Sequence, residues 1–362
     1  MSLPRTMRAV VLTGHGGFER LAYRDDVPVP EPGLGEVLVR IAAASVNNTD
    51  INTRTGWYSR AVTEGTTVAG AAGGYAATAG EDSGWTGGGF VFPRVQGADA
   101  CGEICAAGSG VAASRIGERV LVEPVFRAPG AEPATAVYFG SERDGAFAEY
   151  AVVPAAHAHR IQSQYSDAEL ASFPCAYSAA ENMLTRAAVR AGETVLVTGA
   201  SGGVGSAAVQ LARRRGAEVI AVASAAKADL VASLGAARVI ARGTDLSSAV
   251  GTESVHVVID VVGGPQFGQL LTILRRGGRY AVAGAIGGPL VELDLRTLYL
   301  KDLHLLGCTV LEPGVFANLV GYIERGEIRP VVSATYPLAA IVAAQRDFLE
   351  KQHTGKIVLL VR

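Results

Sequence analysis

Four glycines lie within eight residues, TGASGGVG, at positions 198–205. Gly199, Gly202 and Gly205 are spaced three apart, and Gly203 is the fourth. The apolar run VLV precedes this stretch and the amphipathic run SAAVQLARRR follows it, so the pattern predicts a strand, a tight turn and a helix. Glycines let another group come close to the backbone, and the first turn of a helix offers free N–H donors and a partial positive charge. Such a turn is typical of an anion site, and pyrophosphate is its usual occupant in this context.

The elements that must position this turn extend from 194 to 308. Apolar runs alternate there with helical stretches, and six such runs can be counted. This alternation is typical of βαβ units around a buried parallel sheet. We therefore predict a doubly wound α/β domain that binds a dinucleotide.

The residues after the second predicted strand, EVIAVASAAK, bear on which dinucleotide is bound. An NAD site places an Asp or Glu about 20 residues after the glycines, where it bonds the ribose 2′-hydroxyl. This strand instead ends at Ala223 and Ser224, Lys227 follows closely, and Arg242 comes after the third strand. A hydroxyl and two cations suit a 2′-phosphate through charge-assisted hydrogen bonds. We predict NADP(H) as the cofactor, with solvated charges at both cations as the alternative.

Length and charge narrow the class of protein. A chain of 362 residues favours two domains, and a formal net charge of −2 gives no reason to expect nucleic acid or a membrane as a partner. The sequence starts without a signal-peptide pattern, and no apolar segment approaches the roughly 18 residues of a membrane helix. We therefore expect a cytoplasmic protein that acts on a small-molecule substrate. Its four cysteines indicate free thiols rather than a disulfide framework.

The rest of the chain is predicted to form a mostly β domain. Short β-type runs separated by Gly and Pro clusters fill the first part, and the segment after 315 is expected to return to it. The predicted boundaries are 1–160 with 316–362 for this domain and 161–315 for the dinucleotide domain. Within the predicted β domain, the segment 65–89 holds nine glycines in 25 positions. It is predicted to be a surface loop, or else a flap over a cleft that carries Tyr75 and Trp85.

Taken together, these segments resemble the medium-chain dehydrogenase/reductase superfamily, and most closely its quinone oxidoreductase-like, zinc-independent branch. The resemblance runs nearly end to end and rests on MRAVVL, EVLVRIAAASVNNTDIN, QGADACGEI, GERVL, GAFAEYAVVP, ELASFPCAYSAAENML, AGETVLVTGASGGVGSAAVQLA, IDVVGG, LRRGGRYAVAGA and GKIVLLV. It implies a GroES-like catalytic domain, a Rossmann domain with a six-stranded sheet, and a cleft between them where the nicotinamide meets the substrate. It also implies a homodimer or homotetramer, with DLHLLGC as the joining edge strand. The family's AxxGxxG turn starts here at Gly199 in place of alanine.

The resemblance also bears on zinc. Zinc-dependent members place three ligands at positions that correspond here to Asn47, Ala98 and Cys175. Only the cysteine is a good zinc ligand, whereas a catalytic zinc takes three protein ligands. We therefore predict no metal. Asp99 together with Cys175 keeps open the alternative of an alcohol dehydrogenase with an atypical metal site.

Without a Lewis acid, the site favours acceptors that are already electrophilic, such as a quinone or the C=C bond of an enone. Hydride addition makes an enolate, which hydrogen-bond donors stabilise before a proton arrives from a side chain or water. The resemblance places three candidate catalytic residues at the cleft. Tyr58 is predicted to be the hydrogen-bond donor and candidate proton donor, Asn47 to orient substrate or cofactor, and Asp50 to brace the turn or act as a base.

The predicted function is that of an NADPH-dependent oxidoreductase acting on an activated C=C bond or a quinone. A low-turnover NADPH-binding protein is a further alternative. The predicted cofactor contacts are Ser201, Gly202, Gly203, Val204, Gly205, Ser224, Lys227, Arg242, Val262, Gly263, Ala283, Gly284, Ala285 and Lys356. Lys356 is expected to reach a phosphate or a ribose, or else to be an exposed lysine at the start of a strand.

Overall fold

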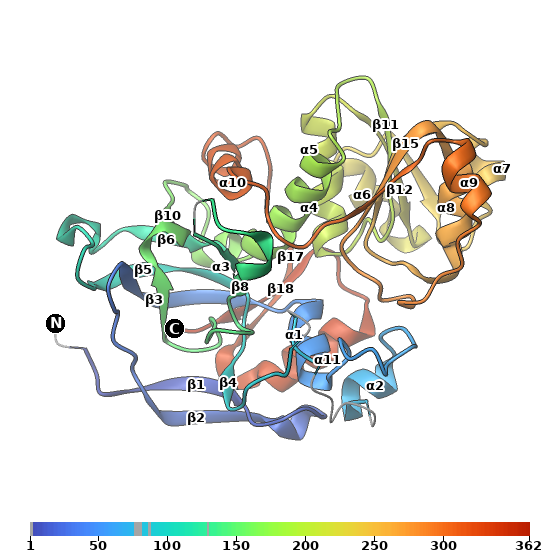
Figure 1. Cartoon of the computed structure of the whole chain (residues 1–362). Helices are drawn as coiled ribbons and strands as arrows, with labels where there is room; N and C mark the ends of the chain where they lie inside the picture. The colour runs from blue at the N-terminus through green and yellow to red at the C-terminus, as the bar shows by residue number, and fades with distance from the viewer. Residues whose placement is uncertain (1–2, 76–81, 86–87, 129) are drawn as a thin grey trace.

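The computed structural model of the chain describes residues 3–75, 82–85, 88–128 and 130–362 (Figure 1). The chain forms a β-rich domain, which holds both of its ends, and an α/β domain that lies between them in sequence. No helix within these described ranges is long and apolar enough to cross a lipid bilayer.

The β-rich domain is built around a seven-stranded sheet. Its strands are β3 (Glu36–Ser45), β5 (Asp99–Ala107), β6 (Arg119–Val122), β9 (Tyr150–Pro154), β10 (Ala158–Arg160), β17 (Val332–Pro337) and β18 (Lys356–Leu360). They follow the order β10-β6-β5-β3-β18-β17, and β9 also pairs with β3. Strand β18 pairs antiparallel with β3 and parallel with β17, so segments far apart in the sequence lie side by side. The near-continuous apolar run of β3 is typical of a strand covered on both faces, and most of its residues are buried.

Shorter elements complete this domain. They are β1 (Thr6–Leu12), β2 (Leu21–Pro28), β4 (Arg94–Val95), β7 (Val125–Phe126), β8 (Val137–Tyr138), α1 (Asn48–Thr55), α2 (Val68–Gly73), α3 (Asp167–Leu170) and α11 (Ile341–Glu350). Helix α11 packs against β17 and β18, so the C-terminal segment both covers and completes the sheet.

The α/β domain contains a six-stranded sheet whose strands are all parallel. These strands are β11 (Thr194–Val197), β12 (Glu218–Ala223), β13 (Arg238–Ala241), β14 (Val255–Asp260), β15 (Leu274–Val282) and β16 (His304–Gly307). The helices are α4 (Pro174–Arg186), α5 (Gly203–Arg214), α6 (Ala228–Ser233), α7 (Leu246–Val250), α8 (Phe267–Ile273), α9 (Leu295–Leu300) and α10 (Val315–Glu324). The strand order β13-β12-β11-β14-β15-β16 reverses between β11 and β14, which makes the crevice at their carboxyl ends the expected ligand position.

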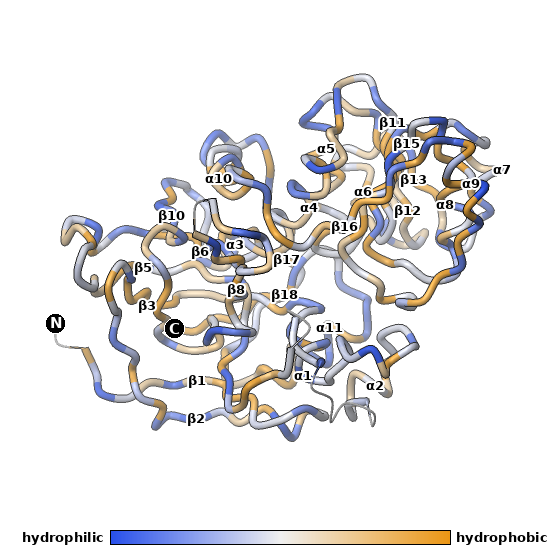
Figure 2. The backbone as a smooth tube through the Cα atoms, in the orientation of Figure 1, coloured by the Kyte–Doolittle hydropathy of each residue, from blue (hydrophilic) through white to orange (hydrophobic). Residues whose placement is uncertain are grey.

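The predicted fold class is confirmed: a GroES-like β domain accompanies a Rossmann domain with a parallel six-stranded sheet. Figure 2 shows hydrophobic stretches along the strands of both sheets and hydrophilic residues in many of the loops that connect them. The predicted boundary between 315 and 316 falls at the start of α10, which packs against α4. The sheet of the β-rich domain resumes only at Val332.

Candidate active site

A cavity of about 240 Å³ lies where the two domains meet. Of the predicted site residues, those that line it are Asn47, Tyr58, Gly203, Val204, Ala283, Gly284, Ala285 and Lys356. Those that do not line it are Asp50, Ser201, Gly202, Gly205, Ser224, Lys227, Arg242, Val262 and Gly263. The cavity therefore extends from the glycine turn of the Rossmann domain to the cleft residues of the β-rich domain.

The glycine turn has the donors that a phosphate requires. Gly199 adopts a left-handed φ of 56°, and a Cβ on Gly205 would lie 2.2 Å from the Gly199 carbonyl oxygen. Helix α5 begins at Gly203 after Gly202, whose lack of a side chain leaves the first turn of the helix without a side-chain cap. The N–H groups of this first turn have no acceptor within the helix, so they can donate to an anion.

The loop after β14 is held by a buried carboxylate that the sequence analysis did not single out. Asp260 accepts hydrogen bonds from the Thr198 hydroxyl at 2.5 Å, the Tyr280 hydroxyl at 2.5 Å and the backbone N–H of Val262 at 2.8 Å. The N–H of Gly263 also donates to it, at 3.1 Å. The available signal was an acid at the end of an otherwise apolar strand, VHVVID. Asp260 thus fixes the backbone of two predicted cofactor contacts.

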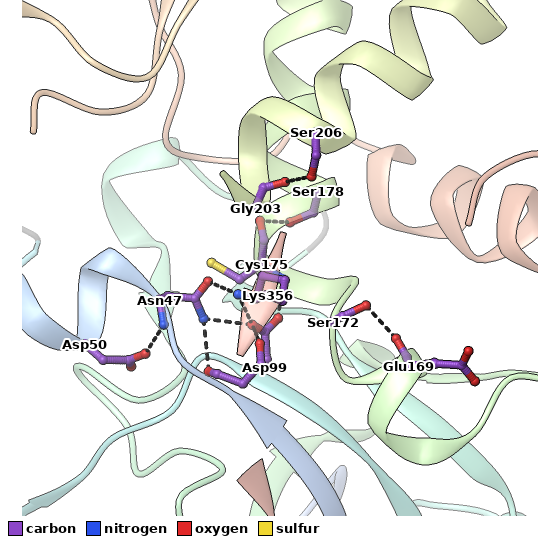
Figure 3. A network of polar contacts seen from close by, with 11 residues as sticks. Asn47, Asp50, Asp99, Glu169, Ser172, Cys175, Ser178, Gly203, Ser206 and Lys356 are labelled. Atoms are coloured by element: carbon purple, nitrogen blue, oxygen red, sulfur yellow. Dashed lines mark hydrogen bonds and ion pairs between the residues drawn. The ribbon is translucent and has the colours of Figure 1, made fainter. Parts of the chain in front are cut away.

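A second buried network, centred on Asp99, joins the end of β3, strand β5, helix α4 and strand β18 (Figure 3). The Lys356 ammonium forms an ion pair with Asp99 at 2.9 Å and also donates to the Asn47 side-chain oxygen. The Asn47 Nδ2 donates to Asp99 at 2.7 Å, the backbone N–H of Cys175 donates to it at 2.6 Å, and the Ser45 hydroxyl donates as well. Asp99 is fully buried and Lys356 is 2% exposed. Both oxygens of this carboxylate are therefore occupied, as a buried charge requires.

This network changes the expected environment of two predicted residues. Lys356 is not an exposed lysine at the start of a strand, because its ammonium is buried against Asp99 while its side chain lines the cavity. The amide of Asn47 is engaged at both ends, since Nδ2 also lies 3.3 Å from the Ser45 carbonyl oxygen. In this arrangement both amide N–H groups of Asn47 are used within the protein, and its side-chain oxygen accepts from Lys356. Asn47 therefore positions Lys356 and Asp99.

The donor set around Cys175 bears on the atypical metal site. Its thiol lines the cavity, and burial raises its pKa. The neighbouring carboxylate of Asp99 is already bonded to Lys356, Asn47 and Ser45. Within the described part of the chain, no group of three or more His, Cys, Asp or Glu residues could hold a metal ion. These residues do not fit a catalytic zinc unless the Lys356–Asp99 pair separates.

Asp50 lies behind the cavity wall rather than in it. As the third residue of α1, it accepts a hydrogen bond at 2.8 Å from the backbone N–H of Asn47, the residue that precedes the helix. Burial raises the pKa of its carboxyl to about 7, although this hydrogen bond and the Lys356 charge act in the opposite direction. The structure thus places Asp50 as a helix cap, in agreement with the bracing role and not with a base that contacts the substrate.

Tyr58 faces the cavity as part of an aromatic wall. Its hydroxyl donates to the Thr49 hydroxyl at 3.2 Å, and burial raises its pKa to about 12. Its ring is nearly parallel to that of Trp85, at 6° with centroids 6.3 Å apart, and Trp85 stacks on Tyr138 at 4.1 Å. Trp57 meets the Tyr58 ring edge-on at 5.7 Å.

The glycine-rich segment contributes Trp85 to this wall. Beside it, Asp82 accepts a hydrogen bond from the backbone N–H of Arg60 at 3.0 Å, and the Ser83 hydroxyl lies 2.7 Å from His15 Nε2. Tyr75, by contrast, is buried outside the cavity lining, and its hydroxyl donates to the Gly65 carbonyl at 3.2 Å. The rest of the predicted flap, 76–81 and 86–87, lies outside the described residues.

The two cations predicted to hold a 2′-phosphate differ in their surroundings. The Lys227 ammonium donates to the carbonyl oxygens of Lys351 at 2.8 Å and His353 at 2.6 Å, so backbone groups already occupy it. Arg242 is exposed, and its guanidinium makes no ion pair within the described ranges. Of the two, only Arg242 is available to a ligand without breaking a contact.

The fold and the cavity together define a two-domain oxidoreductase that depends on a pyridine nucleotide. Comparison with family models agrees, because residues 33–163 match the alcohol dehydrogenase GroES-like domain and residues 203–325 match the zinc-binding dehydrogenase family. The chain belongs to the medium-chain dehydrogenase/reductase superfamily and is quinone oxidoreductase-like within it.

Among its relatives is the acryloyl-coenzyme A reductase of Metallosphaera sedula, which is 31% identical over 98% of this chain and 99% of that protein. The human quinone oxidoreductase is 26% identical over 99% and 98% of the two chains. Among solved structures, a candidate alcohol dehydrogenase from Sinorhizobium meliloti 1021 is 48% identical, with a TM-score of 0.87 over 99% of this chain and 97% of that one. A mycobacterial protein solved with NADPH is 27% identical, with a TM-score of 0.76 over 98% and 99% of the two chains.

Proposed function

We propose that this protein uses NADPH to transfer hydride to an activated C=C bond or a quinone, without a metal ion. The observation that carries this proposal is the chemistry of the cavity wall. The described lining residues include no Asp, Glu or His, and their single charged side chain, Lys356, is already paired with Asp99. Such a wall offers no carboxylate or imidazole base to take the proton of an unactivated alcohol, so an acceptor that is already electrophilic suits it best.

When bound, the nicotinamide nucleotide supplies the hydride. The glycine turn offers N–H donors to its phosphates, and Ala283, Gly284 and Ala285 lie at the carboxyl end of β15, where the crevice places the ligand. The Tyr58 hydroxyl, on giving up its hydrogen bond to Thr49, donates toward the substrate oxygen that gains charge. Because its pKa is raised to about 12, Tyr58 stays protonated at neutral pH and remains a donor. The aromatic wall excludes water from this end of the cavity.

Two observations favour NADPH over NADH. Strand β12 ends at Ala223 and is followed by Ser224 rather than by an acidic residue, and the exposed Arg242 follows the neighbouring strand β13. A carboxylate at this position would repel a 2′-phosphate, whereas a guanidinium binds it through charge-assisted hydrogen bonds.

The proposal is tested by following NADPH oxidation with a panel of quinones, small enones and an enoyl-coenzyme A thioester, with and without a chelator. We expect turnover of at least one acceptor class that the chelator leaves unchanged. Elemental analysis of the same preparation gives the metal content. Activity that appears only on adding zinc, with zinc bound near one equivalent, would instead support the alcohol dehydrogenase with a site at Asp99 and Cys175. Tight NADPH binding with no turnover across the panel would support a nucleotide-binding protein.

A further inference from the structure

Lys351 has a backbone conformation that a lysine rarely adopts. It ends α11 with φ 56° and ψ 24°, the left-handed region that favours glycine. Its ammonium donates to the Asn48 side-chain oxygen at 3.1 Å and lies 3.9 Å from the centroid of the Phe348 ring. Non-glycine residues in this conformation are often found at functional sites. We therefore ask what the Lys351 side chain binds.

The charge of Lys351 has no counter-ion. Throughout the described ranges, no carboxylate lies within ion-pair distance of Lys351 or of Lys227. Burial lowers the pKa of Lys351 to about 8, and repulsion from Lys227 contributes to the shift. A partly buried cation without a partner is unfavourable, and an anionic ligand would remove that cost.

The position of Lys351 indicates which anion this is. The backbone N–H of Gly355 donates to the Ser201 carbonyl at 2.8 Å, so the segment 351–356 lies against the glycine turn. Asn48 and Phe348, the two residues that contact the Lys351 ammonium, line the same cavity as Gly203. The cation therefore lies just behind the cavity wall, on the C-terminal segment that contacts the glycine turn.

We propose that Lys351 is a phosphate-binding residue, whose ammonium pairs with a phosphate group of the nicotinamide nucleotide held by the glycine turn. This inference rests on the proposed function, because it requires that nucleotide. Lys227 is the positioning residue: by bonding the carbonyl oxygens of Lys351 and His353, it fixes the C-terminal segment of the β-rich domain against the Rossmann domain. The phosphate supplies the negative charge that both lysines lack.

The test is equilibrium binding of NADPH and of NADH to the wild-type protein and to Lys351→Gly. Glycine favours the left-handed conformation, so this variant should keep or raise the melting temperature while losing the cation. We expect a loss of affinity of roughly 10- to 100-fold, the range of one charge-assisted hydrogen bond. Lys351→Gln tests the charge alone, and Lys301→Gln is the matched control, because that partly buried ammonium donates to the Leu271 and Thr272 carbonyls away from the cavity.

The two nucleotides distinguish the phosphate involved. Equal losses with NADPH and NADH assign Lys351 to the diphosphate, and a loss confined to NADPH assigns it to the 2′-phosphate. A folded Lys351→Gly protein that binds both nucleotides within twofold of the wild type overturns the inference and leaves the proposed function standing. A wild-type protein that binds neither nucleotide overturns the proposed function itself.

Proton uptake gives a second readout that a structural role would not change. Lys227 and His353 are the titratable groups that face Lys351, and His353 has a pKa lowered to about 4, so it stays neutral near pH 8. A phosphate beside Lys351 raises its pKa, so wild-type binding at pH 8.0–8.5 should take up protons, seen as a calorimetric enthalpy that depends on the buffer. We expect Lys351→Gly to lose most of this uptake. Unchanged uptake in that variant contradicts the inference.

Discussion

The Asp99 carboxylate shows how much of this site depends on single side chains with distant partners. Lys356 and Asp99 are 257 residues apart in sequence, yet their ion pair joins β18 to β5 directly beneath the cavity. From the sequence, Lys356 is a lysine at the start of a strand, and no local pattern reveals its burial. Separation of the two residues would leave a buried charge unpaired, which is unfavourable. The Lys356–Asp99 pair is therefore expected to stay intact in the folded protein.

Asp50 gives a prediction about pH. Its pKa in the folded protein, about 7, lies above the ordinary value of 3.8, so between about pH 4 and pH 7 the folded state binds a proton that the unfolded state lacks. The stability contributed by this group is therefore present at low pH and is lost as pH rises through 7. Asp50→Asn should remove this dependence. Each pKa unit corresponds to about 1.4 kcal/mol, so relative to the wild type the variant should gain on the order of 1–4 kcal/mol between pH 4.5 and pH 8.

Urea unfolding of both proteins at the two pH values measures this difference. The comparison with the variant cancels the contributions of the other carboxyl groups, many of which act in the opposite direction. Parallel stability profiles for the two proteins would show that Asp50 does not titrate in this window.

Tyr58 gives a prediction about catalysis. If its hydroxyl stabilises the developing charge, Tyr58→Phe should lower kcat by roughly 10- to 100-fold, because one donor to an oxyanion is removed. Affinity for NADPH should not change, since Tyr58 lies in the aromatic wall and not at the glycine turn. Steady-state kinetics and NADPH titration measure the two effects. Tyr138→Phe is the matched control in the same wall, and an equal kcat for wild type and Tyr58→Phe would exclude the assigned role.

Arg242 and Lys227 should behave differently from each other. Arg242→Ala should weaken NADPH by about 10- to 100-fold and leave NADH unchanged, because only the 2′-phosphate distinguishes the two nucleotides. Lys227→Ala should weaken both, because Lys227 holds the carbonyls of Lys351 and His353. Fluorescence titration with each nucleotide checks this. Equal losses of NADPH and NADH in Arg242→Ala would refute the 2′-phosphate assignment.

Among the elements, the described part of the glycine-rich segment contributes one aromatic side chain to the cavity. This side chain is Trp85. The neighbouring residues Asp82 and Ser83 hold the segment in place by hydrogen bonds to Arg60 and His15. Trp85→Ala should therefore change substrate range more than cofactor affinity. We expect the ratio of kcat/KM for aromatic over small aliphatic enones to fall about 2- to 10-fold, the worth of one aromatic contact, with an unchanged Kd for NADPH.

A kinetic panel on the wild type, Trp85→Ala and the control Tyr75→Phe makes the comparison. Tyr75 belongs to the same segment but does not line the cavity. An unchanged acceptor profile in Trp85→Ala would remove the segment from the substrate site. Trimming 66–88 is the coarser version of the same test, with the same expected outcome.

Helices and strands with a regular pattern of apolar residues were predictable from the sequence. The contacts that these elements make with residues far away in the sequence were not. The six alternating runs from 194 to 308 became β11–β16, because parallel strands buried on both faces must read as apolar runs. The glycine turn was found for the same local reason. The network at Asp99 was missed because its members come from β3, β5, α4 and β18, and only the tertiary fold brings these together. Lys351 was missed because a lysine gives no sign in the sequence that its backbone will adopt the left-handed conformation.

At the scale of the whole molecule, one end of the Rossmann sheet is open within the described part of the chain. Strand β16 is an edge of the Rossmann sheet, and the exposed large apolar side chains in it and in the segment just before it in sequence are Leu290, Val291, Leu295, Tyr299, Leu300 and Leu305. An exposed apolar face next to an open sheet edge favours association with a second copy of the same chain. We therefore predict a homodimer, formed through this face with two-fold symmetry.

Light scattering coupled to gel filtration measures the oligomeric state. Leu305→Glu combined with Tyr299→Glu should convert the dimer to a monomer, because two charges would be desolvated at each contact. Leu34→Glu is the control, since Leu34 is exposed elsewhere in the chain. A wild-type protein with the mass of one chain, or a double variant that stays dimeric, would contradict this interface.

The place of β18 between β3 and β17 has a consequence for biosynthesis. Strand β3 leaves the ribosome early, but the partner that completes its sheet is made only after the entire Rossmann domain. The Rossmann domain, whose strands are contiguous in sequence, can acquire its structure while translation continues. The β-rich domain must wait with the end of β3, from Ala43 to Ser45, unpaired on this side, so its maturation, and with it the assembly of the cleft, is expected to follow that of the nucleotide-binding half. Arrested chains that stop before Lys356 should therefore resist protease within 194–308 and remain sensitive in the β-rich domain.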